Sequence, residues 1–133
     1  MTGERDLRGL LHLMGPELNP GRFVFATVPH GAVPGGVTPV VTVTEGEGTT
    51  LVLPEGEAAA SGLEYDFVAG WITLRVPSAL HAVGLTAAVA LALTDVGMSC
   101  NVVAGYHHHH LFVPYARASE AVEVLRRLAA ESG

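Results

Sequence analysis

The stretch that decides the fold is residues 67–113, FVAGWITLRVPSALHAVGLTAAVALALTDVGMSCNVVAGYHHHHLFV. It opens with a run rich in Trp, Ile, Val and Thr, which is typical of a β-strand. A helical spacing of apolar residues follows Ser78, which we predict to be the N-cap, and ends near Gly97, a C-cap signal. Two more strands, 99–104 and 107–113, complete a β-α-β-β order.

A last helix beginning at Ser119 extends this order to β-α-β-β-α, which is most of a ferredoxin-like βαββαβ unit without its last strand. The first half of the chain has surplus strands and only short helical segments. Asn19-Pro20-Gly21 predicts a turn before the first of these strands. The Pro- and Gly-rich segment 29–39 predicts a loop where a helix would be expected, so we expect the first half to be mainly structural.

We therefore predict an α+β fold of two tandem ferredoxin-like units, with antiparallel sheets and with helices on one face. The predicted division is residues 1–62 and residues 63–133. Because one unit lacks a strand and the other has surplus strands, the economical arrangement is one in which the halves exchange strands.

Composition restricts the classes of partner. The net charge is −6 and no basic cluster occurs, which argues against nucleic-acid binding. No apolar run approaches the roughly 20 residues needed to span a bilayer, so we expect no membrane partner. The single cysteine fits a reducing cytoplasm. The charged fraction is 15%, against about 25% in typical domains, which suggests that some apolar surface is buried against another chain.

The first candidate site is the strand-to-helix corner at residues 77–86. Backbone N–H groups at a helix start are unsatisfied and attract a carboxylate or a phosphate. Ser78 adds a hydroxyl, and Gly84 allows another backbone or a ligand to come close. The alternative is that Ser78 only caps the helix and Gly84 only packs on a neighbour.

Polar residues of the following strands give a second candidate. Asn101 and Gly105 share a strand face, and an amide beside a glycine can both donate to and accept from an amino-acid backbone. The alternative is an Asn bonded to its own turn or to the sheet edge. Cys100 is interpreted as a structural thiol.

The histidine run 107–110 divides by strand alternation into two pairs. His108 and His110 point one way with Phe112, and His107 and His109 point the other way. The i, i+2 spacing can bind a divalent metal, although two histidines alone are a weak metal site. We expect His108 and His110 to hydrogen-bond within the fold or to a ligand, and His107 and His109 to be solvated or at an interface.

The chain resembles the family of tandem ACT-like domain proteins over nearly its whole length. The segments that carry the resemblance include MGPEL (14–18), EGEG (45–48), TLVL (50–53), WITL (71–74), AVGLTAA (82–88), NVVAGY (101–106) and LFVP (111–114). The resemblance implies a ferredoxin-like fold that binds amino acids or similar metabolites and regulates enzymes. It also implies that the strand-to-helix corner receives the carboxylate of the ligand.

The sequence thus predicts a non-catalytic regulatory module that binds a small molecule, an amino acid or related metabolite, without a cofactor. The predicted ligand-binding residues are Ser78, Ala82, Val83, Gly84, Leu85, Thr86, Asn101, Val102, Gly105, His108 and His110. Two alternatives stay open. One is a metal-binding protein that uses the histidine run, with His108 and His110 as candidate ligands, and the other is an interaction module that acts on an enzyme in trans.

Overall fold

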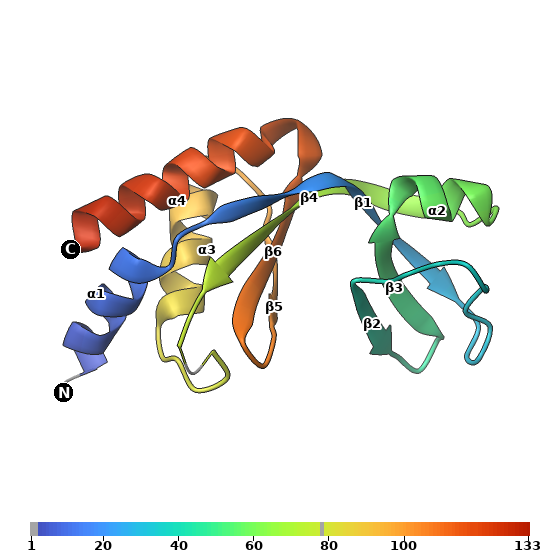
Figure 1. Ribbon diagram of the computed structural model, residues 1–133, viewed down its shortest axis with the longest axis horizontal. Coiled ribbons are helices and arrows are strands. Elements are labelled where there is room, and N and C mark those ends of the chain that lie inside the picture. Colours follow the sequence, from blue (N-terminus) through green and yellow to red (C-terminus); the bar gives the residue numbers. More distant parts are fainter. Residues whose placement is uncertain (1–2, 78) are drawn as a thin grey trace. The chain divides into compact units, whose positions relative to one another are not determined.

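The computed structural model describes residues 3–77 and 79–133 (Figure 1). The chain divides into two compact units: unit 1 comprises Met1–Pro20 and Gly70–Gly133, and unit 2 comprises Gly21–Ala69. Two long strands, β1 (Glu17–Val28) and β4 (Tyr65–Arg75), each contribute to both units. No helix in the described part of the chain has the length and apolarity needed to cross a membrane.

Unit 1 has the strand order β1-β4-β6-β5, which is the order of a ferredoxin-like sheet whose edge strand is supplied by β1. Its remaining elements are α1 (Gly3–Leu13), α3 (Leu85–Asp95), β5 (Asn101–Ala104), β6 (His108–Pro114), the 3₁₀ helix η1 (Tyr115–Arg117) and α4 (Ala118–Ser132). The predicted α+β fold of tandem ferredoxin-like units is confirmed. Helices α1 and α4, from opposite ends of the chain, pack against each other (Figure 1).

The start of β1 is the strand that the second half of the chain lacks. The amide of Asn19 donates to the carbonyl oxygen of Trp71 at 3.2 Å and to Oγ1 of Thr73 at 2.9 Å, both on β4. The predicted turn at Asn19-Pro20-Gly21 is therefore wrong, because these residues lie inside β1. The amide of Asn19 bonds across the sheet instead of closing its own turn, and Gly21 takes a φ of 107° within the strand.

The core of unit 1 lies between its sheet and its three helices. Ile72 and Leu74 of β4 and Leu111 and Val113 of β6 alternate toward this core. Helix α3 contributes its buried residues at i, i+4 and i+8, namely Leu85, Val89 and Leu93. Helix α4 buries one face, which includes Ala121, Val122 and Leu125. Leu91, also on α3, is 60% exposed.

Helix α3 ends as the sequence predicts, at Gly97 with a φ of 70°. The amide of Gly97 donates to Thr94 and the amide of Met98 donates to Leu93, which is the Schellman arrangement. The guanidinium of Arg117 donates to the carbonyl oxygens of Val96 and Gly97. The end of α3 is thus closed by its own backbone and by a cation from η1.

Unit 2 is smaller and has one short helix. The strand order is β2-β3-β1, continued by the first part of β4, whose Phe67 ring lies edge-on to Phe25 at 5.7 Å. The elements that belong to this unit alone are β2 (Val41–Thr44), β3 (Thr49–Pro54) and α2 (Glu55–Ala60). Strands β2 and β3 form an antiparallel hairpin, and the predicted loop at 29–39 is confirmed.

The core of unit 2 is formed by β1, β3 and α2. Its buried residues are Val24, Ala26, Val28, Leu51, Leu53 and Ala58. Strands β1 and β3 pair antiparallel with Phe25 opposite Val52. Gly48, directly before β3, lies so close to β1 that a Cβ there would be 2.6 Å from the carbonyl oxygen of Val28, so only glycine fits.

Candidate functional site

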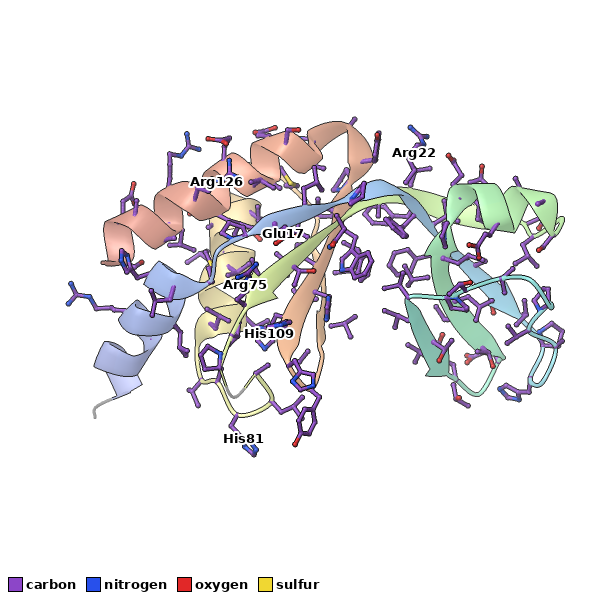
Figure 2. The ribbon with its side chains drawn as sticks, in the orientation of Figure 1. Glu17, Arg22, Arg75, His81, His109 and Arg126 are labelled. Atoms are coloured by element: carbon purple, nitrogen blue, oxygen red, sulfur yellow. The ribbon has the colours of Figure 1, made fainter. Side chains whose placement is uncertain are left out.

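The loop between β4 and α3 meets the β5–β6 turn at a hollow of about 410 Å³. We call it the loop–turn hollow; its lining residues are Val76, Pro77, Leu80, His81, Tyr106 and His107. Figure 2 shows His81 projecting from the loop at this end of unit 1. The wall combines aliphatic side chains with a phenol and two imidazoles, and Leu80 and Tyr106 are 55% and 80% exposed.

A buried histidine fastens the loop to the hairpin. His109 is 3% exposed, and its Nε2 lies 2.8 Å from the carbonyl oxygen of Ala79. Because a carbonyl oxygen only accepts, Nε2 carries the hydrogen of this bond. The expectation that His109 is solvated or at an interface is wrong. His109 shares its strand face with Leu111 and Val113, and that face is turned into the core of unit 1.

His110 lies on the opposite strand face, as the alternation predicts. The indole Nε1 of Trp71 donates to its Nδ1 at 3.1 Å, so Nδ1 of His110 is unprotonated. Burial lowers the pKa of His110, and the neighbouring His108 and His109 lower it further. Gly105 makes room for this ring, because a Cβ there would lie 3.1 Å from Nε2 of His110. The other histidine on this face, His108, is exposed.

The start of α3 differs from its prediction. The helix begins at Leu85 with Gly84 as its N-cap, so its N-terminus is not at Ser78, which lies outside the described residues. Gly84 has a φ of 87°, and a Cβ there would lie 3.1 Å from a methyl group of Leu7. Residues 79–81 form a turn, and a left-handed Gly84 separates this segment from the helix.

The other predicted residues of this corner are distributed differently. Leu85 is fully buried and Ala82 packs against the core, whereas Val83 is 81% exposed and Thr86 is also exposed. On β5, Asn101 is exposed opposite Phe112, and Val102 packs on the core opposite Leu111. The structure thus brings together the predicted loop and the predicted turn, but the residues that line their hollow are neighbours of those named.

Sequence reasoning did not include Leu80, Tyr106, His81 and His107 among the ligand-binding residues. The available signal was the position of large side chains in segments that connect elements, since connecting segments carry function more often than the elements do. Tyr106 and His107 pack edge to face with ring centroids 5.1 Å apart. They form one wall of the hollow together.

The histidine run was weighed as a possible metal site. Over the described residues, no group of three or more His, Cys, Asp or Glu side chains is placed to hold a metal ion. His109 and His110 are engaged with Ala79 and Trp71. Burial raises the pKa of the Cys100 thiol to about 11, so this half-buried side chain is a protonated, weakly reactive thiol at neutral pH.

Two profiles of the ACT domain match the sequence in tandem, one over residues 2–70 and the other over residues 66–127. The chain belongs to the ACT-domain family. No curated protein matches the sequence. A solved Vibrio cholerae protein, described as of unknown function and as a possible transport protein, is 44% identical with a TM-score of 0.85. The alignment covers 96% of this ACT-domain chain and 99% of the Vibrio chain.

More distant solved structures share the ACT fold alone. An Agobacterium tumefaciens protein is 16% identical with a TM-score of 0.73, and the alignment covers 87% of this chain and 89% of that one. The regulatory subunit of aspartate kinase from Thermus flavus is 11% identical with a TM-score of 0.62, and the alignment covers 87% and 97%. The resemblance to tandem ACT-like proteins inferred from the sequence is confirmed.

Proposed function

We propose that this tandem ACT-domain protein is a non-catalytic regulatory module that binds an amino acid or a related metabolite in the loop–turn hollow. One observation carries the proposal: the β4–α3 loop and the β5–β6 turn together line a hollow of about 410 Å³. Small-molecule sites in proteins typically enclose roughly 300–1,000 Å³ and combine apolar walls with a few polar groups.

The lining suits a small zwitterion with an apolar side chain. The imidazoles of His81 and His107 can donate hydrogen bonds to a carboxylate. The ring face of Tyr106 can attract an ammonium group. Val76 and Leu80 supply the apolar part of the wall. The bond from His109 to the carbonyl oxygen of Ala79 holds the loop against the hairpin before any ligand arrives, which reduces the entropy that binding must overcome.

The comparisons support a regulatory role. ACT domains generally bind amino acids, and aspartate kinase regulatory subunits with this fold occur among the solved structures. The proposal includes a homodimer, since the charged fraction of 15% is low. It also includes a cytoplasmic location, which fits the single free cysteine.

The test is a thermal-shift screen of the natural amino acids at millimolar concentration, with and without a chelator. A ligand that binds only the native state raises the melting temperature. We expect at least one amino acid to do so equally well in the chelator. The variants Tyr106→Ala and His81→Ala should fold, because both side chains are exposed, and should lose the shift.

The matched control is Leu91→Ala, which truncates an exposed residue of α3 that does not line the hollow. It should keep the shift. No shift with any amino acid, or a shift that survives both hollow variants, would contradict the proposal. A shift that requires added metal and disappears in the chelator would favour the histidine-run alternative.

A further inference from the structure

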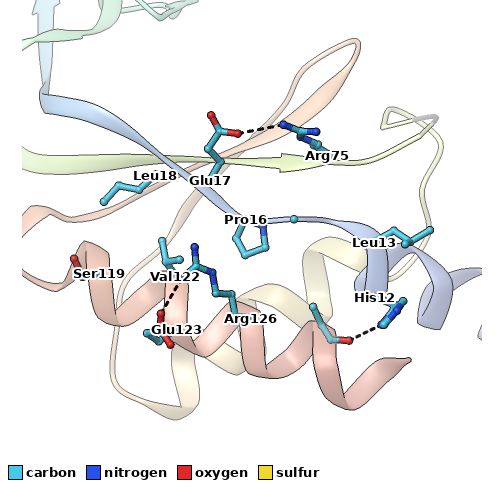
Figure 3. A pocket seen from close by; sticks show the side chains of 12 residues that line it. His12, Leu13, Pro16, Glu17, Leu18, Arg75, Ser119, Val122, Glu123 and Arg126 are labelled. Carbon is cyan, nitrogen blue, oxygen red and sulfur yellow. Dashed lines mark hydrogen bonds and ion pairs between the residues drawn. The ribbon is translucent and has the colours of Figure 1, made fainter.

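A second and larger hollow of about 920 Å³ lies in unit 1 between the end of α1, the start of β1 and one side of α4 (Figure 3). We call it the arginine–glutamate hollow, after Glu17, Arg75, Glu123 and Arg126 in its lining. In Figure 2, Arg126 and Glu17 lie away from His81, so the two hollows occupy different regions of unit 1.

The hollow contains apolar surface that the monomer leaves in water. Leu13, in the last turn of α1, is 69% exposed and Leu18, on β1, is 39% exposed, and both line the hollow. Pro16 and Val122 form a buried floor between them. Apolar surface surrounded by charged groups is the usual composition of a protein–protein contact.

The charges of this hollow differ from those of the whole chain. The protein has 13 acidic residues against seven basic ones, so two copies repel each other over most of their surfaces. The hollow carries two arginines and two of the glutamates, which sum to zero formal charge. A patch with equal numbers of both signs is self-complementary, because a two-fold axis can place each arginine opposite a glutamate of the other copy.

The ion pairs in the hollow could be replaced by ion pairs with a second copy of the chain. Nη2 of Arg75 lies 3.3 Å from Oε2 of Glu17, and Nη1 of Arg126 lies 3.0 Å from Oε1 of Glu123. Within the described chain each guanidinium makes one hydrogen bond to its carboxylate, although a guanidinium has five N–H donors. All four side chains are more than 60% exposed. Such exposed pairs contribute little to stability, so they can rearrange to face a partner at small cost.

We propose that the arginine–glutamate hollow is the interface at which two copies of this chain associate about a two-fold axis. Leu13 and Leu18 of each copy are covered at the centre of the interface. Arginines and glutamates at its rim pair across the axis. This inference rests on the proposed homodimer and locates its contact surface, and it is independent of the ligand in the loop–turn hollow.

Analytical ultracentrifugation over a range of micromolar protein concentrations tests the proposal. We expect the wild type to dimerise. Leu13→Asp should weaken the dimer by at least about tenfold in dissociation constant, since it places a charge in the apolar centre. Arg126→Glu should weaken it through like charges. The double reversal Arg126→Glu with Glu123→Arg keeps the charge balance and the spacing of the pair, and should restore most of the association.

Two controls separate this surface from others. Leu91→Asp changes an exposed leucine of α3 outside the hollow, and Val43→Asp changes an exposed residue of the edge strand β2. Both should dimerise as the wild type does. A monomeric wild type would overturn the inference, as would a dimer that survives Leu13→Asp or one that Val43→Asp abolishes. Circular dichroism melts establish that each variant is folded.

The amino-acid thermal shift, measured on the Leu13→Asp monomer, distinguishes the two proposals. A monomer that still responds to the amino acid supports a ligand site contained in one copy and an interface located at the hollow. A wild-type dimer that responds to no amino acid leaves the interface supported and contradicts the ligand proposal.

Discussion

The two units differ in what covers their sheets. Unit 1 has three helices and a core of seventeen buried residues, whereas unit 2 has the six-residue helix α2 and a core of six, counted over the described residues. Where unit 1 follows its first full strand with α3, unit 2 has the Pro- and Gly-rich loop 29–40. The loop–turn hollow belongs to unit 1.

This difference shows that the sheet of the fold can form with little helical cover. The antiparallel register of β1, β2 and β3 forms with only a short helix against it, because the strands alternate apolar residues toward a small common core. Unit 1 forms the loop–turn hollow with its β4–α3 loop, and the corresponding connection in unit 2 is the loop 29–40, which is not followed by a helix. We therefore expect unit 1 to bind the ligand and unit 2 to be structural.

The largest loss of stability should come from substitutions in the two cores. Leu111 and Leu51 are matched strand leucines, 1% and 0% exposed, in unit 1 and unit 2 respectively. We expect Leu111→Ala to lower the free energy of unfolding by about 3–5 kcal/mol and Leu51→Ala by about 2–3 kcal/mol. The smaller core around Leu51 can collapse further into the cavity. Chemical denaturation measures both values. A greater loss of stability for Leu51→Ala than for Leu111→Ala would contradict the expected difference between the two cores.

An intermediate effect is expected where β4 touches α4 in unit 1. A Cβ on Gly70 would lie 2.6 Å from Cβ of Ala118, so Gly70→Ala forces the helix away from the strand. We expect a loss of about 1–3 kcal/mol. Gly46→Ala, in the unit 2 hairpin with no atom within 4 Å of its Cβ, should change stability by less than about 0.5 kcal/mol. Equal melting temperatures for the two variants would show that the strand and helix can separate freely.

The smallest effect is a pH dependence located in unit 1. The lowered pKa of His110 means that the native state binds fewer protons than the unfolded state near pH 6. Its contribution to stability is therefore complete above about pH 6.5, the ordinary histidine value, and is lost as the pH falls through the lower native pKa. Protonation also removes the acceptor for the indole of Trp71.

The single tryptophan reports this titration directly through its fluorescence. We expect the emission of Trp71 to change as the pH falls below about 6.5 and the change to be absent in His110→Gln. A profile that is the same in both proteins would assign the acid response to another group. The variant should also lose part of the decrease in stability on acidification.

Much of the fold could be predicted because it depends on local periodicity. The alternation of β6 correctly separated His110 from His109, and Gly97 correctly marked the end of α3, since strand pleat and left-handed backbone are local properties. The turn at Asn19-Pro20-Gly21 failed because its amide found a partner on β4, more than fifty residues away in the sequence.

The lining of the loop–turn hollow was predicted less well for the same reason. The loop and the turn were identified, but the start of α3 was placed at Ser78 because a serine is a common N-cap. In the structure Gly84 takes this role with a left-handed backbone that a sequence pattern does not specify. His81 and Tyr106 became neighbours only when the loop folded against the hairpin.

The amino-acid sequence by itself determined the order of strands and helices in the second half of the chain and the need for an exchanged strand, because these follow from periodicity along the chain. Its motifs, such as those at 82–88 and 101–106, carried the resemblance to a domain family. Only the tertiary structure decided that His109 is buried against Ala79 and that α1, β1 and α4 enclose a charge-balanced hollow. Those features depend on contacts between segments far apart in the sequence, and no local pattern records which residues will meet.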